Sequence, residues 1–256
     1  MTQARRTDRD TIKLLAALSM LPNHIAEMFL PEDTLLRALL IGIGYMAAIT
    51  MCFFLTEGFR FTSSRRRYGT RLLVFALLSE LPYLAAFSGP GTGAQNELLT
   101  HAPLNMIFTL FLCFLILFVR EMPLLGRTER ALSVGALLLL SSLSDWGILA
   151  PLFVLFFASS KPSESGRRKA FAACLLLLSA DHLLEVLFLG YPPEEGLLRV
   201  LLSLTGPLLA AFLILFCYDG RAHRSGKHRK AVQYFFYLFY PAHLAILCLV
   251  RFLFFS

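Results

Sequence analysis

Nine apolar runs, each of roughly the length that crosses a membrane, constrain this chain more than any other feature. In lipid, every backbone N–H and C=O group must find its partner within the protein, so runs of this kind fold as helices. The 256-residue chain is 57% hydrophobic and only 16% charged, which leaves no segment for a separate soluble domain. The sequence therefore predicts an all-α, polytopic transmembrane helical bundle that forms a single domain over 1–256. The runs lie at about 12–30, 35–57, 71–87, 104–119, 131–143, 146–158, 170–189, 197–218 and 232–254.

Lysine and arginine residues alternate with these runs in a way that predicts the topology. Of the 24 Lys and Arg residues, 21 fall in the N-terminus through Lys13 and in the stretches 58–71, 120–130, 161–169 and 219–230. Loops rich in these residues stay in the cytoplasm. We therefore expect nine crossings, with the N-terminus in the cytoplasm and the C-terminus outside. The net charge of +7 follows from this topology, and we expect no nucleic-acid partner.

The fifth and sixth runs, 131–143 and 146–158, are short. As helices each would be roughly 20 Å long, against a hydrocarbon core of about 30 Å. Basic stretches flank the pair on both outer sides, so the number of crossings between them must be even. The runs form either two short spans or a re-entrant hairpin, and both arrangements place Asp145 near the outer surface or at membrane depth.

Ionisable residues inside a membrane helix are costly, so each one is a candidate functional residue. In the first run, Lys13 and His24 are eleven positions apart, which returns them to nearly the same helix face about 16 Å apart along the axis. Glu27 lies one turn beyond His24, and Pro22 frees a backbone carbonyl close to it. We interpret His24 as an acid–base group in the outer third and Lys13 as a cytoplasmic cation. The alternatives are a packed histidine bonded to a carbonyl and a snorkelling lysine.

Further imidazoles and carboxylates are expected at a similar depth, which suggests one polar cavity near the outer surface. Asp181 and His182 are adjacent within the seventh run, where two ionisable side chains need partners. For Asp145 the alternative is a cap on a helix that starts at Trp146, and for His101 it is an interfacial loop position. The full set comprises His101, Asn105, Asp145, Asp181, His182, Glu185 and His243.

Five arginines follow the second run. Because guanidinium pairs with phosphate in a forked geometry, they can bind the phosphates of a nucleotide-bearing donor. The alternative is the topology signal itself together with attraction to anionic lipid. These residues are Arg60, Arg65, Arg66, Arg67 and Arg71.

The five cysteines stand alone in apolar runs, with no CxxC pair and no histidine at metal-ligand spacing. We therefore expect neither disulfides nor a metal site. No glycine-rich phosphate loop, GxSxG or HExxH motif is present.

Five motifs in chain order carry a resemblance to a known family. They are the first run ending in "NH" (Asn23 and His24), "EGF" with a basic run and "Y..RL.....SE.P" (57–82), "N..FTL" (105–110), "SDWG" (144–147) and "YFFYLFYPAHLAIL" (234–247). From about residue 12 to the C-terminus, the chain resembles the TraX family of polytopic membrane proteins, named for the conjugative-plasmid protein that acetylates the N-terminus of pilin. It is more distantly similar to the membrane acyltransferases that O-acetylate surface glycans.

The resemblance implies an acetyl-CoA-dependent acetyltransferase in the bacterial plasma (inner) membrane. Cytosolic acetyl-CoA would supply an acetyl group to an amine or hydroxyl of a peptide, glycan or lipid acceptor, with His24 acting as general base or becoming transiently acetylated. The candidates for the chemistry are His24, Asn23, Glu27, Asp145, Asp181, His182 and His243. The candidates for donor binding are Lys13, Glu57, Arg60, Arg65, Arg66, Arg67, Tyr68 and Arg71. Glu80 and Asn105 are expected to line the site.

The sequence departs from these families at three places. Asn23 stands where many relatives have an aspartate, "FTSS" replaces a more polar stretch, and Lys13 stands where the glycan-modifying enzymes usually have arginine. Two other functions are compatible with the pattern. One is a proton-coupled transporter with a relay of His, Asp and Glu, although no repeat is visible between the halves. The other is a non-catalytic assembly factor for a conjugation or envelope machine, in which the polar residues only pack helices.

Overall fold

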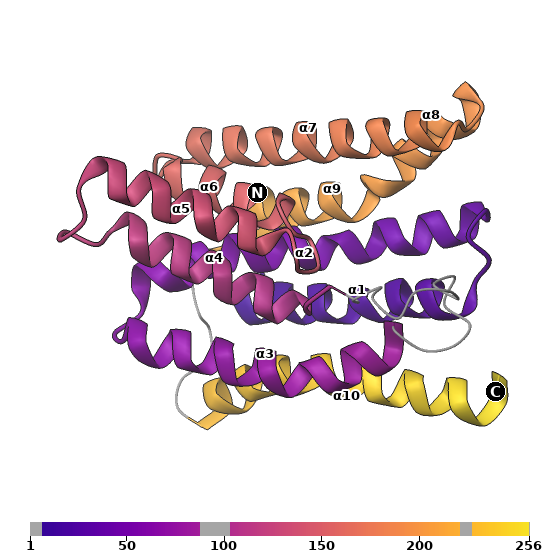
Figure 1. The fold of residues 1–256 in the computed structure, drawn as a ribbon, viewed down its shortest axis with the longest axis horizontal. Coiled ribbons are helices and arrows are strands. Elements are labelled where there is room, and N and C mark those ends of the chain that lie inside the picture. Colours follow the sequence, from indigo (N-terminus) through magenta and orange to yellow (C-terminus); the bar gives the residue numbers. More distant parts are fainter. Residues whose placement is uncertain (1–6, 88–102, 221–226, 256) are drawn as a thin grey trace, which may run out of the picture. The chain divides into compact units, whose positions relative to one another are not determined.

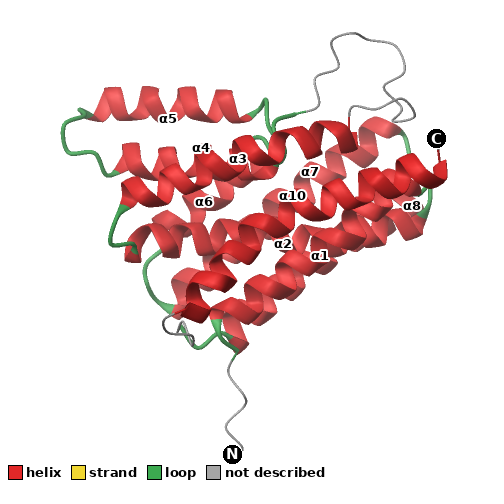
Figure 2. Ribbon diagram, turned by 90° about the horizontal axis from the view of Figure 1, so that it is seen from below, coloured by secondary structure: helices red, strands yellow, loops and turns green. Residues whose placement is uncertain are grey.

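The computed structural model describes residues 7–87, 103–220 and 227–255. Over these residues the regular elements are all helices, drawn red in Figure 2, and the only strand-like pairings are two isolated bridges. The prediction of an all-α protein is confirmed. The chain divides into two compact units, Met1–Met51 with Ser160–Phe239 (unit 1) and Cys52–Ser159 with Tyr240–Ser256 (unit 2).

Unit 1 begins with a capped helix, and the longest helix that lies wholly within it ends at a glycine. The Asp8 side chain accepts a hydrogen bond from the Thr11 backbone N–H at 2.9 Å and so starts α1. Gly190, at φ 70°, ends α7 in the left-handed conformation that glycine allows. Figure 1 shows α7 running beside α8 and α9, which it contacts. The elements are α1 (Arg9–Phe29), the first part of α2 (Leu35–Phe61), α7 (Glu164–Leu189), α8 (Pro193–Ser203), α9 (Thr205–Phe212), the π-helix η1 (Leu213–Cys217) and the first part of α10 (Lys227–Phe255).

Glycines allow close helix packing within unit 1. A Cβ added to Gly206 in α9 would lie 2.4 Å from the carbonyl oxygen of Gly42 in α2. A Cβ added to Gly44 in α2 would lie 2.3 Å from Cβ of Asn23 in α1. Small residues let membrane helices approach in this way, where dispersion between closely packed helices replaces the hydrophobic effect. The spacing of α1 from α2 therefore depends on Gly44.

Unit 2 is built around α4, which packs against α3, α5 and α6. Cys113 and Ile116 of α4 are fully buried, and the Phe114 ring makes edge contacts with Phe59 and Tyr68 at centroid distances of 5.4 and 5.5 Å. The elements are the end of α2, α3 (Arg65–Phe87), α4 (Met106–Arg120), α5 (Arg127–Ser141), α6 (Leu149–Ser159) and the second part of α10 (Lys227–Phe255).

Each of the nine predicted apolar runs coincides with helix. The eighth is interrupted near Leu204, where α8 ends and α9 begins. Five of the described helical stretches are long and apolar enough to cross a membrane, which identifies a membrane protein. They are Leu35–Phe61, Arg65–Phe87, Glu164–Leu189, Pro193–Cys217 and Tyr234–Phe254. Helix α1 has the length of a span but carries too many polar residues to meet the same standard, while α4 and α6 are apolar and shorter.

The two short runs form two helices joined by an anchored turn. The Leu104 backbone N–H donates to the carbonyl of Leu143 at 2.9 Å, and the Asp145 N–H donates to the carbonyl of Leu104 at 2.7 Å. Trp146 adopts φ 57° in this turn. The expected helix start at Trp146 is wrong, because α6 begins at Leu149 and Asp145 lies in the turn before it.

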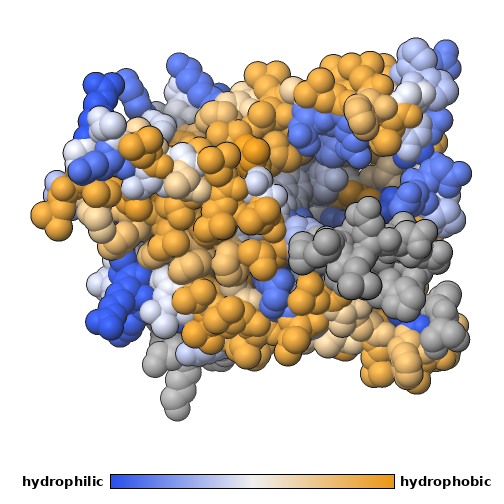
Figure 3. All heavy atoms as spheres, viewed as in Figure 1, coloured by the Kyte–Doolittle hydropathy of each residue, from blue (hydrophilic) through white to orange (hydrophobic). Residues whose placement is uncertain are grey.

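Apolar side chains cover much of the face drawn in Figure 3. Helix α7 carries several large exposed ones, of which Phe188 is 92% exposed. Such a surface is unfavourable in water and suits a lipid environment. The large hydrophobic side chains exposed on the second half of α7 are Leu183, Leu184, Leu187, Phe188 and Leu189.

Candidate functional site

The imidazole of His24 lies against the carboxylate of Glu27 in unit 1. Nδ1 of His24 is 3.1 Å from Oε2 of Glu27, one turn away on α1. His24 and its neighbour Asn23 are buried, and Lys13 is half-buried on the same helix. Because α1 continues through Pro22 without a break, the predicted spacing of Lys13 from His24 is kept. The adjacency of His24 and Glu27 predicted from the sequence is thus present.

A second imidazole in unit 1 stacks on an aromatic ring. His182 of α7 lies over Tyr45 of α2, with ring centroids 5.3 Å apart and an interplanar angle of 12°. Its Nδ1 is 2.9 Å from Oε2 of Glu185, while Nε2 is buried without a hydrogen-bond partner. Asp181 is exposed, because adjacent helical residues point about 100° apart. The structure therefore gives the two neighbours different surroundings, and Tyr45 is a partner that the sequence did not suggest.

In unit 2, Asn105 and Glu80 form one polar cluster. The Asn105 amide Nδ2 donates to Glu80 and to the carbonyl of Ala76, at 2.7 Å for the latter. The Tyr240 hydroxyl accepts from the Met106 N–H at 3.4 Å, and the Tyr240 ring contacts the buried His243 ring at 5.7 Å. The expected site-lining residues Glu80 and Asn105 therefore lie together, and Tyr240 brings α10 to the same end of α4.

The SDWG turn reaches the same end of α4 through Thr109, one turn after Asn105. The Thr109 hydroxyl lies 3.0 Å from the hydroxyl oxygen of Ser144 and donates to the carbonyl of Asp145. Thr109 and Ser144 are buried, whereas Asp145 is only half-buried. The motifs "N..FTL" and "SDWG" thus meet in space, and the Asp145 backbone bonds Leu104 through its N–H and Thr109 through its carbonyl.

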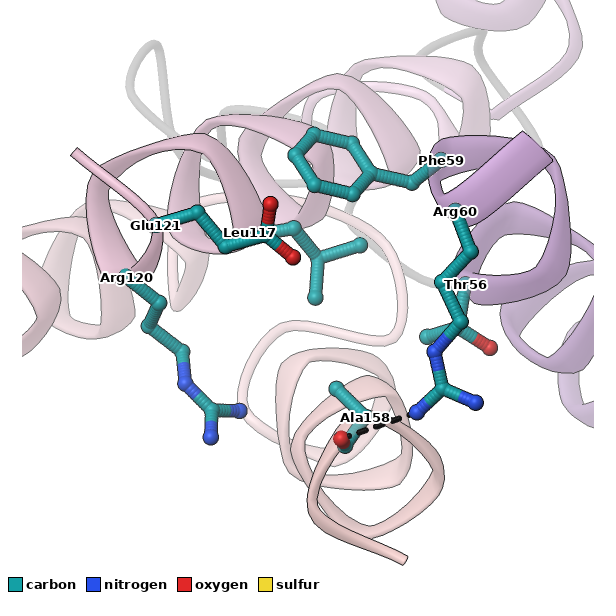
Figure 4. Close-up of a pocket in the computed structure, with 7 residues that line it drawn as sticks. All are labelled: Thr56, Phe59, Arg60, Leu117, Arg120, Glu121 and Ala158. Carbon is teal, nitrogen blue, oxygen red and sulfur yellow. Dashed lines mark hydrogen bonds between the residues drawn. The ribbon is translucent and has the colours of Figure 1, made fainter. Parts of the chain in front are cut away.

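The opposite end of unit 2 holds a small basic pocket. It has a volume of about 140 Å³, and Figure 4 shows the side chains of Arg60 and Arg120 on either side of the end of α6. Arg60 donates to the carbonyls of Phe157 and Ala158 at 3.2 and 2.9 Å, and Arg120 donates to the Ser159 hydroxyl at 3.0 Å. The lining residues are Thr56, Phe59, Arg60, Leu117, Arg120, Glu121 and Ala158.

Most of the other predicted donor-binding residues lie around this end of unit 2, whereas Lys13 lies in unit 1. Arg65 pairs with Glu121 and lies 4.3 Å above the Phe59 ring. Arg71 lies 5.7 Å from the Tyr68 ring centroid. Three more were expected to bind the donor and do not line the pocket: Glu57 is half-buried on α2, and Arg66 and Arg67 are exposed on α3.

Of the pocket residues, only Arg60 was a candidate from the sequence. Arg120 was counted as a topology arginine, and the sequence signal that marks it is its position as the last residue of an apolar helix. His101, also a candidate, lies outside the described residues. Among the residues that are described, no three His, Cys, Asp or Glu side chains come close enough to hold a metal ion, and all five cysteines are free.

Comparison with known proteins agrees with the motifs in the sequence. The family described as "TraX protein" matches residues 8–251. The chain is also similar to a protein of Dichelobacter nodosus named "Probable fimbrial assembly protein FimC, serogroup H1", with 31% identity over 245 residues that cover 93% of each chain. No solved structure matches the chain significantly. With nearly its whole length matched, the chain belongs to the TraX family.

Proposed function

We propose that this protein is an integral membrane acyltransferase that moves an acetyl group from cytosolic acetyl-CoA to an amine or hydroxyl acceptor at or across the membrane. The observation that carries the proposal is the buried His24, paired with Glu27 in a chain of the TraX family. A buried imidazole held by a carboxylate is suited to proton transfer near neutral pH. The acceptor is a peptide, glycan or lipid, and the fimbrial name of the relative favours a pilin-like peptide.

In this mechanism His24 acts as the general base. With Nδ1–H donating to Glu27, Nε2 carries the lone pair that takes the proton from the acceptor. The acceptor nitrogen or oxygen attacks the thioester carbonyl carbon, the C–S bond breaks, and the departing thiolate of CoA takes the proton from His24. Transient acetylation of His24 is the variant of this route in which the imidazole itself attacks first.

Asn23 and Asn105 are assigned different roles. The developing oxyanion needs a hydrogen-bond donor, and Asn23 adjoins His24. Asn105 uses its side-chain amide to bind Glu80 and the carbonyl of Ala76, so we assign it to organising, with Asp145 and His243, the polar cluster of unit 2. His182, whose Nδ1 lies against Glu185, and the neighbouring exposed Asp181 are proposed as further acid–base groups.

The proposed topology places the donor in the cytoplasm. Nine crossings within one membrane domain of the bacterial inner membrane, with the N-terminus inside and the C-terminus outside, put Lys13 and the arginines of 60–71 at the cytoplasmic surface. In support, the basic ends of α2, α3 and α4 meet at one end of unit 2, as the contacts of Arg60, Arg65 and Arg120 record. Donor binding there requires no metal.

The test is acetyl transfer by the purified full-length protein in lipid nanodiscs. The nanodiscs receive radiolabelled acetyl-CoA and a panel of amine peptides and hydroxyl-bearing glycans. We expect release of CoA together with an equal amount of label on one acceptor. His24→Gln should lower the rate by about a hundredfold or more, as expected for loss of a general base. Ser19→Ala is the control and should be active, because the Ser19 hydroxyl donates to the carbonyl of Ala16 on the same helix. Transfer that is unchanged in His24→Gln would overturn the assignment.

A second function is supported by the relative's name alone. A non-catalytic assembly factor would use the same polar residues to pack helices. In that case His24→Gln changes thermal stability or pilus assembly, while wild-type protein transfers no acetyl group to any acceptor. The nanodisc assay therefore separates the two functions.

A further inference from the structure

We infer that the pocket between the ends of α2, α4 and α6 binds a phosphate group through Arg60 and Arg120. The inference rests on the proposed function, under which this phosphate belongs to the diphosphate of the CoA donor. This assignment narrows the expected donor site from a run of five arginines to one of them, and adds Arg120, which lies 60 positions further along the chain.

The pocket brings two guanidinium groups together from different helices. In Figure 4, Arg60 approaches the end of α6 from α2, and Arg120 approaches it from α4. The Phe59 ring and Leu117 form an apolar wall beside them. A volume of about 140 Å³ admits a phosphate or diphosphate group but not a whole nucleotide. The rest of such a ligand must therefore extend out of the pocket.

The charges around the pocket leave a positive excess. Glu121 also lines it, but its carboxylate is paired with Arg65, so these two charges offset each other. The carbonyl ends of α2, α4 and α6 each contribute roughly half a negative charge. Arg60 and Arg120 then leave a net charge of about +0.5, since hydrogen bonds to carbonyl and hydroxyl groups do not remove the charge of a guanidinium. An anion is the ligand that this arrangement favours.

The Arg120 side chain has a buried N–H group without a hydrogen-bond partner. Its Nη2 donates to Ser159, whereas Nη1 is buried and has no hydrogen-bond partner. A buried donor of a charged group without a partner costs free energy, so an acceptor that enters the pocket is stabilised. The Thr56 hydroxyl donates its only proton to the carbonyl of Phe53 at 2.6 Å, so it does not donate to a ligand in the pocket. The ligand oxygens must therefore face the two arginines.

Two sources present this chemistry, the diphosphate of CoA and the phosphate of an anionic lipid headgroup. The experiment uses full-length protein in nanodiscs of neutral lipid and measures binding of CoA, with inorganic pyrophosphate as competitor. A second arm measures binding of a short-chain phosphatidylglycerol to the same nanodiscs. Arg120→Gln and Arg60→Gln should each weaken binding of the phosphate ligand about tenfold or more, and Arg120→Lys, which keeps the charge but loses the fork, should weaken it less.

Two control variants separate binding from folding. Arg127→Gln removes an exposed arginine from the start of α5, outside the pocket, and should change CoA affinity less than twofold. Ser159→Ala removes the hydroxyl that Arg120 contacts but keeps the arginine, so affinity should stay within about threefold of wild type. If Arg120 only stabilised the end of α6, Ser159→Ala and Arg120→Gln would have similar effects on thermal unfolding, and CoA affinity would be unchanged in both.

The outcomes distinguish this inference from the proposed function. CoA binding that depends on Arg60 and Arg120 supports both. Acetyl transfer that depends on His24, together with CoA affinity that is the same in wild type and in Arg120→Gln, overturns the pocket assignment and leaves the function standing. Binding of phosphatidylglycerol that depends on both arginines, in a protein that does not bind CoA, supports the phosphate pocket and contradicts the function. If neither ligand nor pyrophosphate responds to these variants, the pocket is not a phosphate site.

Discussion

Asn105 holds Glu80 against the first turn of α4. Its amide Nδ2 donates to the Glu80 carboxylate, while its Oδ1 accepts from the backbone N–H groups of Ile107 and Phe108 at 3.0 and 3.2 Å. The same side chain therefore caps one helix and positions a carboxylate on another. Asn105 is fully buried, so no water can replace either set of bonds without opening the packing.

Asn105→Ala should destabilise the protein by about 2–4 kcal/mol. Loss of the cap contributes about 1 kcal/mol, and the Glu80 carboxylate loses a donor in partly buried surroundings. The measurement is chemical or thermal unfolding in detergent. Asn105→Asp keeps an equally good cap but places a second carboxylate beside Glu80, so it should also destabilise; an Asp variant as stable as wild type would mean that the contact with Glu80 contributes little.

Gly44→Ala should also destabilise the protein, by a few kcal/mol. The added Cβ would lie 2.3 Å from Asn23, so α1 and α2 would have to separate. Gly135→Ala in α5 is the matched control, because no atom lies within 4 Å of its added Cβ. Alanine favours helix over glycine by about 1 kcal/mol, so this variant should be neutral or stabilising in the same unfolding assay. Equal changes in the free energy of unfolding for the two variants would contradict close packing at Gly44.

Local contacts along one helix were predictable from the sequence, and contacts between helices were not. The nine apolar runs and the adjacency of His24 to Glu27 follow from helical periodicity alone. Pairing of Asn105 with Glu80, or of His182 with Tyr45, joins positions 25 and 137 residues apart. No periodicity within one segment sets which helix faces which.

Two further details were hidden for physical reasons. Helix α6 begins only at Leu149, because Trp146 adopts φ 57° in the preceding turn, although the apolar run starts at 146. Arg120 looks like any interfacial arginine, because its significance depends on the end of α6, 39 residues away, arriving beside it. The break at Leu204, by contrast, has a reason in the sequence, because Pro207 lacks the backbone N–H that would bond the carbonyl of Ser203, where α8 ends.

Glu27→Gln should lower acetyl transfer about tenfold, less than replacement of His24. The amide keeps the size of the side chain and one hydrogen bond to Nδ1, but no longer offers a full negative charge to the imidazolium that forms during transfer. The comparison is of kcat for transfer in wild type and in Glu27→Gln, with unfolding measured in parallel. A rate equal to wild type would show that Glu27 does not assist His24.

Cysteine labelling should reveal opposite ends of α7 on opposite sides of the membrane. In a variant without native cysteines, Glu194→Cys at the start of α8 should react with a membrane-impermeant maleimide in intact cells. Ser165→Cys in the first turn of α7 should react only after permeabilisation, because its flanking loop is basic. Both positions are exposed, so both should react once the membrane is opened. Labelling of Ser165→Cys in intact cells would contradict the proposed topology and place the start of α7 outside.

The length of α4 sets the distance between the two polar ends of unit 2. Its 15 residues rise about 22 Å from Asn105, beside Glu80 at one end, to Arg120 at the other. If the CoA diphosphate binds at Arg120, its pantetheine arm has to cover this length to bring the thioester to the depth of Asn105. Donor analogues with shortened arms would then bind at Arg120 without their thioester reaching that depth.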